Sequence, residues 1–490
     1  MALARRGVAF RLVDAEPGPG AQSRAMAVHA RTLELYAQYG LADAVIAGGV
    51  PIPAVSLRRS DAEGLSRQVL RVGFDELGEG LSPYPYILAY PQDDHERFLV
   101  DRLAELGVTP EWNTSLQTFR TVDAGFDADL AGPSGVETLR ARYLCGADGA
   151  HSAVRRGLGI GFPGGTYDQR FYVADVKIAG GFDRDLHASL GHEVLALMLP
   201  CRQSGMQRLI GLLPPPLEGR DDLTFEDVRP VAEPMLGVRV TQVNWFSTYR
   251  VHHRVADRLR VGNAFLLGDA GHIHSPAGGQ GMNTGIGDAL NLGWKLADVL
   301  RGGASPAVLD SYEPERLTFA RTLIETTDRA FTGIVRKGVV GELTRRVAAP
   351  LLLRAASRLP IARRQIFRTV SQIRIAYPDS PLSEGAAGDM NAGERLPWAG
   401  AAGADNFAPL QSLDWQAHVY GAPSAALARL CGERALPLHA FGWTDALGSA
   451  GLPRDAALLV RPDGHVAFAS PTQAPDALSA YLDRHALRCG

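Results

Sequence analysis

The sequence predicts an α/β protein in which a mostly antiparallel sheet interrupts an α/β domain and a third, smaller unit follows. Three observations predict this fold class. Helix and strand patterns alternate over residues 1–160, β-rich runs separated by Gly and Pro fill residues 161–258, and a buried strand and a long helix resume after Arg260. The chain has 490 residues, 46% of them hydrophobic, which is enough for two or three packed cores.

The first residues have the pattern of the second half of a βαβ unit. Ala2 to Arg6 resemble the last turn of a helix closed by Gly7, and Val8–Val13 is predicted to be a buried strand ending in Asp14. A complete unit spans about 30 residues and opens with a strand and a glycine-rich turn. Roughly 15–25 further residues are therefore expected upstream, and neither the opening strand nor the turn is present.

The next elements follow from hydrophobic periodicity. Residues 20–48 carry a helical pattern with a break at Gly40, and a strand at Tyr86–Tyr90 precedes a helix over 92–107. A strand over Leu139–Cys145 leads into an Asp-Gly turn at residues 148–149. The inserted sheet is expected to contain the strands Phe171–Ile178, Val194–Leu199, Leu209–Leu213 and Thr241–Ser247.

The second half of the chain is divided by composition. Arg260–Leu267 is predicted to be a buried strand, a long helix covers 285–301, and residues 307–375 are largely helical. The third unit has strands near 416–420 and 437–441, a hairpin at Asp463-Gly464 and a last helix. We therefore expect a first domain from 1–160 and 259–382, an inserted sheet from 161–258, a Gly- and Ala-rich linker over 383–408 and a third unit over 409–490.

Charge and cysteine usage exclude several classes of function. A net charge of -3 gives no electrostatic basis for binding nucleic acid or an anionic membrane. Cys145, Cys201, Cys431 and Cys489 are widely scattered, so neither a disulfide framework nor a metal site is predicted. Because no apolar run approaches ~20 residues and the start does not resemble a signal peptide, a cytoplasmic protein is expected.

The strongest chemical signal is the run from Phe265 to Ala297. A buried strand delivers Gly268 and Asp269 at its carboxyl end, where ligands of open α/β sheets bind. Gly278, Gly279 and Gly281 then allow the backbone to approach a flat ring or a phosphate, and a helix begins near that point with its positive dipole end. The carboxylate of Asp269 can accept hydrogen bonds from the hydroxyls of a sugar alcohol chain.

Three weaker signals accompany this run. Cys145-Gly-Ala-Asp-Gly-Ala-His-Ser-Ala-Val-Arg155 places Asp148 and Gly149 after a strand and before a helix. Asp14 ends the second strand, where an acid can bind ribose hydroxyls, and Gln22-Ser-Arg24 follows it. Pro91-Gln92 opens a helix after a strand.

Together these stretches resemble the group A FAD-dependent aromatic monooxygenases, flavoprotein hydroxylases with a p-hydroxybenzoate hydroxylase-like fold. The resemblance covers roughly residues 8–490 and departs from the family in lacking the first GxGxxG loop. It implies an FAD-binding, Rossmann-like domain of the glutathione-reductase type, an inserted β-sheet that contacts substrate, and a thioredoxin-like C-terminal extension without a CxxC pair.

The resemblance also implies roles for single residues. Asp269 would contact the ribityl chain, Arg24 the diphosphate, and Gln92 the flavin, while Asp148, Gly149 and Arg155 would contact FAD and NADPH. The segment after Gly268 implies isoalloxazine and pyrophosphate contacts from Gly279, Gly281, Met282 and Asn283. Pro276 falls where the family places a backbone carbonyl beside substrate and flavin.

In the implied reaction, NADPH or NADH reduces FAD, and the reduced flavin then reacts with O2 to form a C4a-hydroperoxide. This hydroperoxide hydroxylates a phenolic or polyketide-type aromatic substrate. The base that deprotonates the phenol is not identified; Tyr172, Tyr249 and His253 lie in segments that could face substrate, together with Pro276. For His272 and His274, structural hydrogen bonding is expected. Whether the chain forms a homodimer stays open.

Two alternatives come from the same residues. A flavin halogenase or an FAD-linked reductase would share the fold, but a halogenase is expected to carry Trp-x-Trp and a catalytic Lys. Here Trp-x-Trp is absent and the chain has only Lys177, Lys295 and Lys337. A non-enzymatic protein without flavin is the second alternative, and it rests on the missing glycine loop.

Overall fold

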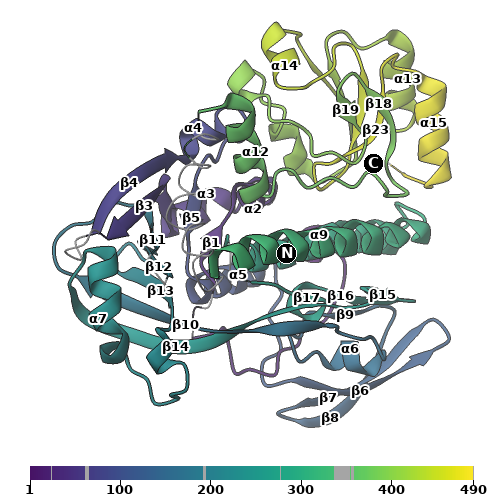
Figure 1. Ribbon diagram of the computed structural model, residues 1–490. Coiled ribbons are helices and arrows are strands. Elements are labelled where there is room, and N and C mark those ends of the chain that lie inside the picture. The colour runs from purple at the N-terminus through teal and green to yellow at the C-terminus, as the bar shows by residue number, and fades with distance from the viewer. Residues whose placement is uncertain are drawn as a thin grey trace.

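The computed structural model describes residues 1–21, 23, 25–60, 66–190, 195–275, 278–335, 354 and 358–488. The helix α9 (Tyr312–Val335) crosses the middle of the molecule, with the C-terminal unit on one side of it and the large sheets on the other (Figure 1). No helix in these described ranges is long and apolar enough to cross a bilayer.

The largest sheet has eight strands, and all neighbours are antiparallel except the pair β11 and β3. Its strands, in spatial order, are β17 (His272–Ile273), β14 (Val240–Val255), β10 (Gly164–Ile178), β13 (Gln207–Leu212), β12 (Leu195–Pro200), β11 (Leu186–Leu190), β3 (Ala54–Ser60) and β4 (Ser66–Gly73). Helix α7 (Phe225–Leu236) covers one face, and the buried cluster beneath it includes Tyr172, Met198 and Leu209. The predicted inserted sheet is thus extended by β3, β4 and β17, which come from outside residues 161–258.

Besides β3 and β4, residues 1–160 form helices and two smaller sheets. β1 (Ala27–Val28), β5 (Ile87–Ala89) and β2 (Val50–Ile52) form one, and β6 (Ser115–Val122), β7 (Gly125–Gly132) and β8 (Gly135–Ala141) form the other. The helices are α1 (Ala2–Arg5), α2 (Ala30–Gln38), α3 (Ala42–Gly48), α4 (Phe74–Gly78), α5 (Gln92–Glu105) and α6 (Ala153–Gly157). The predicted break between two helices is confirmed at Gly40, whose φ is 71°.

Three expected strands differ from the structure. Val8–Val13 is not a buried strand: it makes one bridge, Val13 to Glu111, and has no strand on its other side among the described residues, so its side chains stay partly or fully exposed. The run Leu139–Cys145 is divided between β8 and β9 (Leu144–Gly146), which belong to different sheets. The expected strand after Arg260 is a hairpin, β15 (Arg260–Val261) and β16 (Ala264–Leu266), because Gly262 turns the chain with φ 58°.

The parallel pair β9 and β16 positions the two Asp-Gly turns. Gly146 lies opposite Leu266 in this pair, so the residues that follow each strand leave the same edge of the sheet. Asp148 follows β9, and the short helix η2 (Gly268–Ala270) follows β16. Two motifs separated by more than a hundred residues in the chain therefore lie side by side.

The long helix α8 (Gly281–Leu300) lies against α9 and carries much of the central core. The indole rings of Trp294 on α8 and Trp415 pack edge to face, with centroids 5.5 Å apart, and so join the first domain to the C-terminal unit. The other elements here are η1 (Pro215–Leu217), η3 (Pro306–Ser311) and α12 (Pro360–Val370), which packs on α4.

The C-terminal unit has a six-stranded sheet. Its order is β19 (Met390–Asn391), β18 (Glu384–Ala387), β23 (Val466–Ser470), β22 (Ala457–Val460), β20 (Gln416–Tyr420) and β21 (Leu438–Phe441), with α13 (Ala425–Glu433), α14 (Asp445–Ser449), α15 (Pro475–Arg484), η5 (Gly400–Ala402) and η6 (Ala408–Ser412). The parallel β20–β21 pair followed by the antiparallel β22–β23 hairpin is the thioredoxin-like arrangement that the resemblance implied. Residues 384–391, expected within a linker, instead add β18 and β19 to this sheet.

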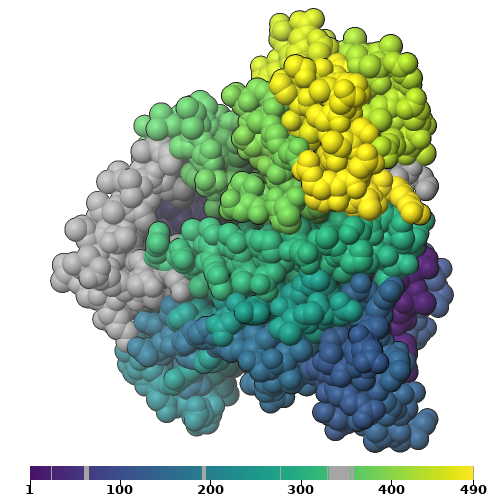
Figure 2. All heavy atoms as spheres, turned by 90° about the vertical axis from the view of Figure 1, so that its right-hand side faces the viewer, coloured from purple at the N-terminus to yellow at the C-terminus, as the bar shows by residue number. Residues whose placement is uncertain are grey.

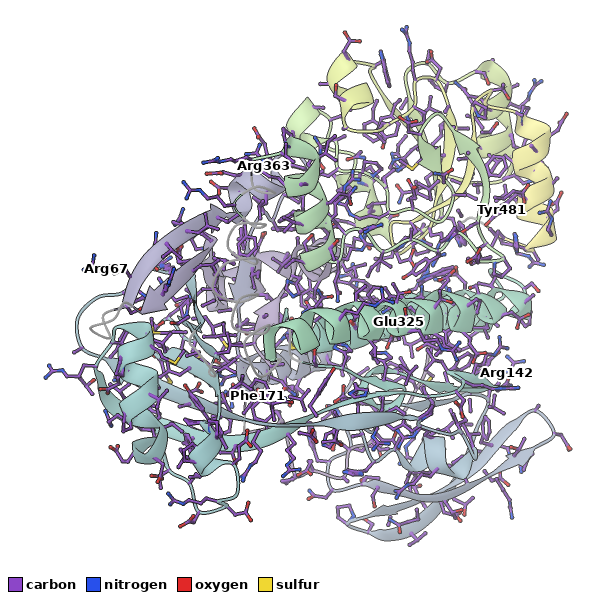
Figure 3. All side chains as sticks on the ribbon, viewed as in Figure 1. Arg67, Arg142, Phe171, Glu325, Arg363 and Tyr481 are labelled. Carbon is purple, nitrogen blue, oxygen red and sulfur yellow. The ribbon has the colours of Figure 1, made fainter. Side chains whose placement is uncertain are left out.

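In Figure 2 the C-terminal unit, in yellow and light green, lies at the top of the molecule. The blue residues that include β6 to β8 lie at the bottom. In Figure 3, Phe171 of β10 lies among the strands of the large sheet, and Tyr481 lies on α15 at the right-hand side of the C-terminal unit.

Candidate functional site

The first turn of α8 is bound to the β1 segment by the side chain of Asn283. Its Oδ1 accepts from the His29 N–H at 2.9 Å and from the Thr32 hydroxyl at 2.7 Å. Its Nδ2 donates to the carbonyl oxygens of Ala27 at 2.8 Å and Gly279 at 3.0 Å. Both donor hydrogens and both acceptor lone pairs of this amide are used within the protein, so only its backbone can face a ligand.

The loop before α8 is packed so closely that glycine is required at one position. A Cβ atom on Gly279 would lie 2.7 Å from the Cβ of Ala27, and the φ of Gly279 is 63°. Gly278 has φ 80°, and its carbonyl lies 2.8 Å from Nε2 of the buried His29. Gly281 opens the helix, and Met282 packs against the core of α2 and α3. The backbone can therefore approach a flat ligand here.

The Gly268–Asp269 turn is tied to the same helix. The Gly268 N–H donates to Oδ2 of Asp288 at 2.9 Å, and a Cβ on Gly285 would meet the Gly268 Cα at 3.2 Å. Gly268 has φ 54°, a left-handed conformation that glycine adopts without strain. The Asp269 carboxylate is exposed, at the carboxyl end of β16.

The Asp148–Gly149 turn caps a short helix. Oδ2 of Asp148 accepts from the N–H groups of Ala153 at 2.7 Å and Val154 at 3.1 Å, and Gly149 has φ 73°. Asp148 is exposed, so it also borders the solvent side of the turn.

Arg155 joins the two turns rather than pointing to solvent. Its guanidinium donates to the carbonyls of Ala270 and Ala150, each at 2.8 Å, and stacks 3.9 Å from the centre of the Phe162 ring. Arg155 is buried, and burial lowers the pKa of its guanidinium. The contact of Arg155 with FAD and NADPH stays a prediction, and the observed bonds of its guanidinium are made within the protein.

Of the remaining predicted residues, the structure describes Gln92 and Asp14. Gln92 begins α5, where its Oε1 accepts from Ala25 N–H at 3.3 Å and its Nε2 donates to Glu96 at 2.7 Å. Asp14 is exposed and accepts from the Glu16 N–H at 2.9 Å. Arg24 and Pro276 lie outside the described residues.

Several buried polar atoms beside this loop have no hydrogen-bond partner among the described residues. They are Nδ1 of His29, Nε2 of His274 and Oγ of Ser275. Ser275 is fully buried, and burial lowers the pKa of His274 to about 4, which keeps its imidazole neutral near pH 7. Unpaired buried groups are costly, so their concentration beside the glycine loop is typical of a ligand site.

His272 follows the expectation of structural hydrogen bonding, because its Nε2 lies 2.7 Å from Oδ2 of Asp288. Asp288 also binds Arg316, and sequence reasoning assigned neither of these two residues to the site. The residue types alone could have indicated this pair, since an aspartate and an arginine in buried helices are usually paired with each other. Among the described residues, no group of acidic, His and Cys side chains could hold a metal ion.

The three substrate-side candidates occupy different environments in the large sheet. Tyr172 is buried under α7, its ring stacked 6.5 Å from that of Phe246, and burial raises the pKa of its hydroxyl. Tyr249 is half-buried and stacked 5.8 Å from the ring of Phe171, and burial raises the pKa of Tyr249 to about 12. His253 lies near the C-terminal end of β14, in a cavity of about 150 Å³ beside α9. The structure does not bring these three together.

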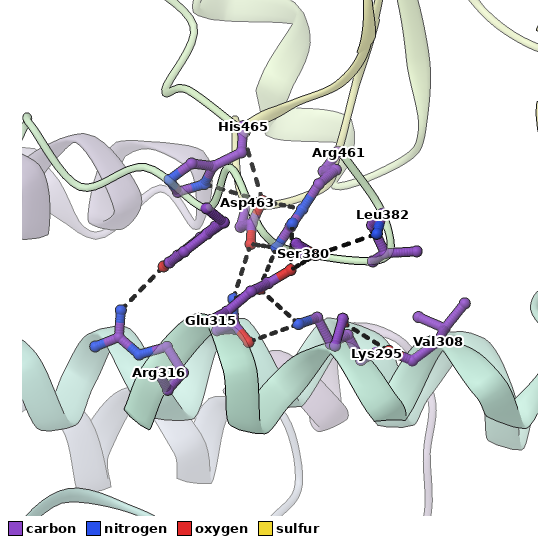
Figure 4. A network of polar contacts seen from close by, with 12 residues as sticks. Lys295, Val308, Glu315, Arg316, Ser380, Leu382, Arg461, Asp463 and His465 are labelled. Carbon is purple, nitrogen blue, oxygen red and sulfur yellow. Dashed lines mark hydrogen bonds and ion pairs between the residues drawn. The ribbon is translucent and has the colours of Figure 1, made fainter. Parts of the chain in front are cut away.

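A fully buried ionic cluster joins α8 and α9 to the C-terminal hairpin (Figure 4). Glu315 accepts from Lys295 at 2.7 Å and from both Nη atoms of Arg461 at 2.7 and 3.0 Å, and Arg461 also binds Asp463. Burial alone would raise the pKa of Glu315, but Arg461 and Lys295 outweigh it and lower that pKa to about 2. Through Glu315, the start of α9 is therefore bound to the C-terminal hairpin.

Comparisons with known proteins agree with this geometry. Residues 1–327 match the family model described as an FAD binding domain. The 6-methylpretetramide 4-monooxygenase of Streptomyces rimosus is 36% identical over 406 residues, which are 80% of this chain and 69% of that protein. The pentachlorophenol 4-monooxygenase of Sphingobium chlorophenolicum is 34% identical over 339 residues, which are 66% of this chain and 60% of that protein.

Among solved structures, the anhydrotetracycline hydroxylase OxyS of Streptomyces rimosus matches with a TM-score of 0.74 at 26% identity, covering 99% of this chain and 95% of that chain. All three relatives are named as monooxygenases or hydroxylases, which favours oxygenation over halogenation, reduction without oxygenation, or a non-enzymatic role.

Proposed function

Because this chain belongs to the FAD-binding-domain family and is an FAD-dependent aromatic monooxygenase, we propose that it hydroxylates a multi-ring, polyketide-type compound with NAD(P)H and O2 as co-substrates. The observation that carries the proposal is the extent of the likeness. By sequence, the 6-methylpretetramide 4-monooxygenase matches 80% of this chain, whereas the match to the chlorophenol enzyme covers 66%. By structure, the anhydrotetracycline hydroxylase covers 99% of it.

The residues at the start of α8 fit a flavin. The left-handed glycines 268, 278 and 279 leave the backbone open to a flat ring, and α8 directs its N–H groups at that place. The unpaired Ser275 and His274 atoms gain partners if polar ring atoms lie against the loop. The chemistry that FAD supplies when bound is hydride acceptance from NAD(P)H and activation of O2.

We assign the protein's part as follows. Asp269 accepts hydrogen bonds from ribityl hydroxyls, and Gly279, Gly281 and Met282 offer backbone contacts to the ring and diphosphate. Asp14, Gln92, Asp148 and Gly149 border the same ligand, and Arg24 and Pro276 keep the roles that the resemblance implied. The side chains of Asn283 and Arg155 hold the loop and the two turns in place, and we assign them this part beside the contacts that the resemblance implied.

The aromatic substrate is assigned to the strands of the large sheet that lie within residues 161–258. Phe171 on β10 is buried and stacks against the half-buried ring of Tyr249 on β14, so the exposed part of the Tyr249 ring is the aromatic surface that we assign to stacking against a flat polycyclic compound. Tyr172 belongs to the core under α7, so we do not assign it to substrate. Because the reaction consumes NAD(P)H, we place the enzyme in the cytoplasm.

A substrate panel tests the proposal. The purified chain is examined for flavin absorbance, and NAD(P)H oxidation is then followed with four-ring phenolic compounds and with chlorinated single-ring phenols. We expect four-ring compounds to accelerate NAD(P)H oxidation and to gain one oxygen atom by mass spectrometry. Coupled hydroxylation of the chlorophenols alone would instead support the second candidate, a substituted-phenol hydroxylase, which the likeness to the chlorophenol enzyme favours.

A further inference from the structure

The side chain of Asp288 binds the backbone of the Gly268–Asp269 turn. Its carboxylate is fully buried on α8 and accepts three hydrogen bonds: from Gly268 N–H at 2.9 Å, from His272 Nε2 at 2.7 Å and from Arg316 Nε at 2.6 Å. Burial alone would raise the pKa of Asp288, but Arg316 and His272 outweigh it and lower that pKa to about 2. The turn is therefore held by an ionised carboxylate, whose hydrogen bonds are stronger than neutral ones.

Arg316 carries the connection from Asp288 to the next layer. Its guanidinium donates to Thr284 O at 3.0 Å, in the first turn of α8, and to the Tyr377 hydroxyl at 3.0 Å. Gly287 makes room for it, because a Cβ there would lie 3.1 Å from Nη2 of Arg316. One side chain thus touches the helix start, the carboxylate behind the turn and a residue beyond α9.

Tyr377 lies against the hairpin of the C-terminal unit. Its ring centre is 4.6 Å from that of His465, and the Arg461 guanidinium lies 5.4 Å from it. Arg461 is itself fixed by Glu315 and Asp463 (Figure 4). The ring of Tyr377 therefore packs against the buried cluster. A continuous chain of bonds and ring contacts leads from the Gly268 amide to the C-terminal unit.

We propose that Asp288 and Arg316 are positioning residues for the flavin, and that through Tyr377 they make the geometry of the Gly268–Asp269 turn depend on the seated C-terminal unit. The inference rests on the proposed function, since it requires FAD at this turn. It goes further in assigning the C-terminal unit, which has no CxxC pair, a part in cofactor binding.

The same helix offers a matched control for a merely stabilising ion pair. Asp298 is also buried on α8 and also paired with an arginine, Arg6 at 2.9 Å, and it accepts from the Trp415 indole at 3.1 Å. It makes no described contact with the Gly268 turn. Loss of either buried carboxylate is expected to destabilise the fold, but only loss of Asp288 should change the flavin.

The experiment compares Asp288→Asn, Tyr377→Phe and Asp298→Asn in the full chain. FAD dissociation constants are measured by fluorescence, and the visible spectrum and midpoint potential of the bound flavin are recorded at saturating FAD. We expect Asp288→Asn to weaken FAD binding at least about tenfold, as loss of a hydrogen bond to a charged group implies. Its spectrum and potential should also shift, and Tyr377→Phe should change both in the same direction to a smaller extent.

Four results would overturn the proposal or the flavin placement on which it rests. Wild-type affinity, spectrum and potential in Asp288→Asn, or an equal loss in Asp298→Asn, would overturn the positioning role. If Asp288→Asn does not fold, Tyr377→Phe decides, because it removes a single hydroxyl; unchanged flavin properties there overturn the inference. Asp269→Ala separates the two proposals: if it retains FAD, the flavin placement fails, and if it loses FAD while Asp288→Asn binds normally, only the inference fails.

Discussion

Asn283 and His29 are joined by a hydrogen bond of 2.9 Å from the His29 N–H to the Asn283 side-chain oxygen, which fixes the start of α8 against the start of α2. The remaining three bonds of this amide reach Thr32, Ala27 and Gly279. The glycine loop is therefore held by a side chain whose hydrogen-bonding groups all have partners within the protein.

We expect Asn283→Ala to destabilise the protein by about 2–4 kcal/mol, because it leaves several buried polar groups unpaired. Asn283→Asp keeps both accepted bonds but loses the two donated ones, and its carboxylate faces the Ala27 and Gly279 carbonyls. Urea unfolding without FAD measures both. A loss of FAD affinity with no change in unfolding free energy would mean that the amide binds the flavin directly.

Arg155 provides a second test, because the structure and the family resemblance point to different roles. In the structure its guanidinium binds Ala270 and Ala150. We expect Arg155→Lys to weaken FAD binding about tenfold, since lysine cannot span both carbonyls with a planar fork. The KM for NAD(P)H at saturating FAD should stay unchanged.

The exposed neighbour Arg156 is the matched control, and Arg156→Lys should alter neither quantity. Steady-state NAD(P)H oxidation at several FAD concentrations separates the two effects. A raised KM for NAD(P)H with normal FAD affinity in Arg155→Lys would instead mean that Arg155 contacts NAD(P)H.

The flavin-side elements could be predicted from the sequence because their signal is local. A buried strand, an Asp-containing turn, a glycine cluster and a long helix follow one another within Phe265–Ala297, and each has a distinct periodicity or turn chemistry. The hairpin around Asp463 was equally local. Such patterns fix an element without reference to any distant partner.

Relationships between distant segments could not be predicted in this way. Asp288 falls in an ordinary helical run, and its partner Arg316 is 28 residues away on another helix. The strand β3 (Ala54–Ser60) was not predicted, and its own residues do not indicate that it pairs with β11, 131 residues later in the chain. The run Val8–Val13 has strand character, yet a strand is buried only when neighbours cover it.

The tyrosines of the large sheet should not serve as the base in phenol deprotonation. Burial raises the pKa of Tyr249 to about 12, so its hydroxyl stays protonated at neutral pH, and Tyr172 lies in the core. We expect Tyr172→Phe and Tyr249→Phe to keep kcat within about threefold, whereas loss of a general base costs about 10²–10⁴-fold. Tyr249→Ala should raise the KM for substrate, because it removes the ring stacked on Phe171. A collapse of kcat and of its pH profile in Tyr249→Phe would contradict this assignment.

The buried cluster of Glu315 should make the fold sensitive to acid. A carboxyl whose folded pKa is about 2 and whose unfolded pKa is ~4.3 contributes stability that is fully present above the unfolded value and is lost as pH falls through the folded one. We therefore expect the free energy of unfolding to fall between about pH 4.5 and pH 2, with Glu315 contributing up to ~1.4 kcal/mol per pH unit.

The variant Glu315→Gln should lose that contribution, and its stability should depend less steeply on pH in this window. At pH 7 it should be less stable by about 3–5 kcal/mol, because Lys295 and Arg461 remain buried without their carboxylate partner. The control Glu384→Gln removes only a partly exposed pair with Arg484 and should cost less than about 1 kcal/mol. Urea titrations at pH 7 and pH 3 measure all three proteins, and parallel pH dependence in wild type and Glu315→Gln would show that this carboxylate is not held ionised by its cluster.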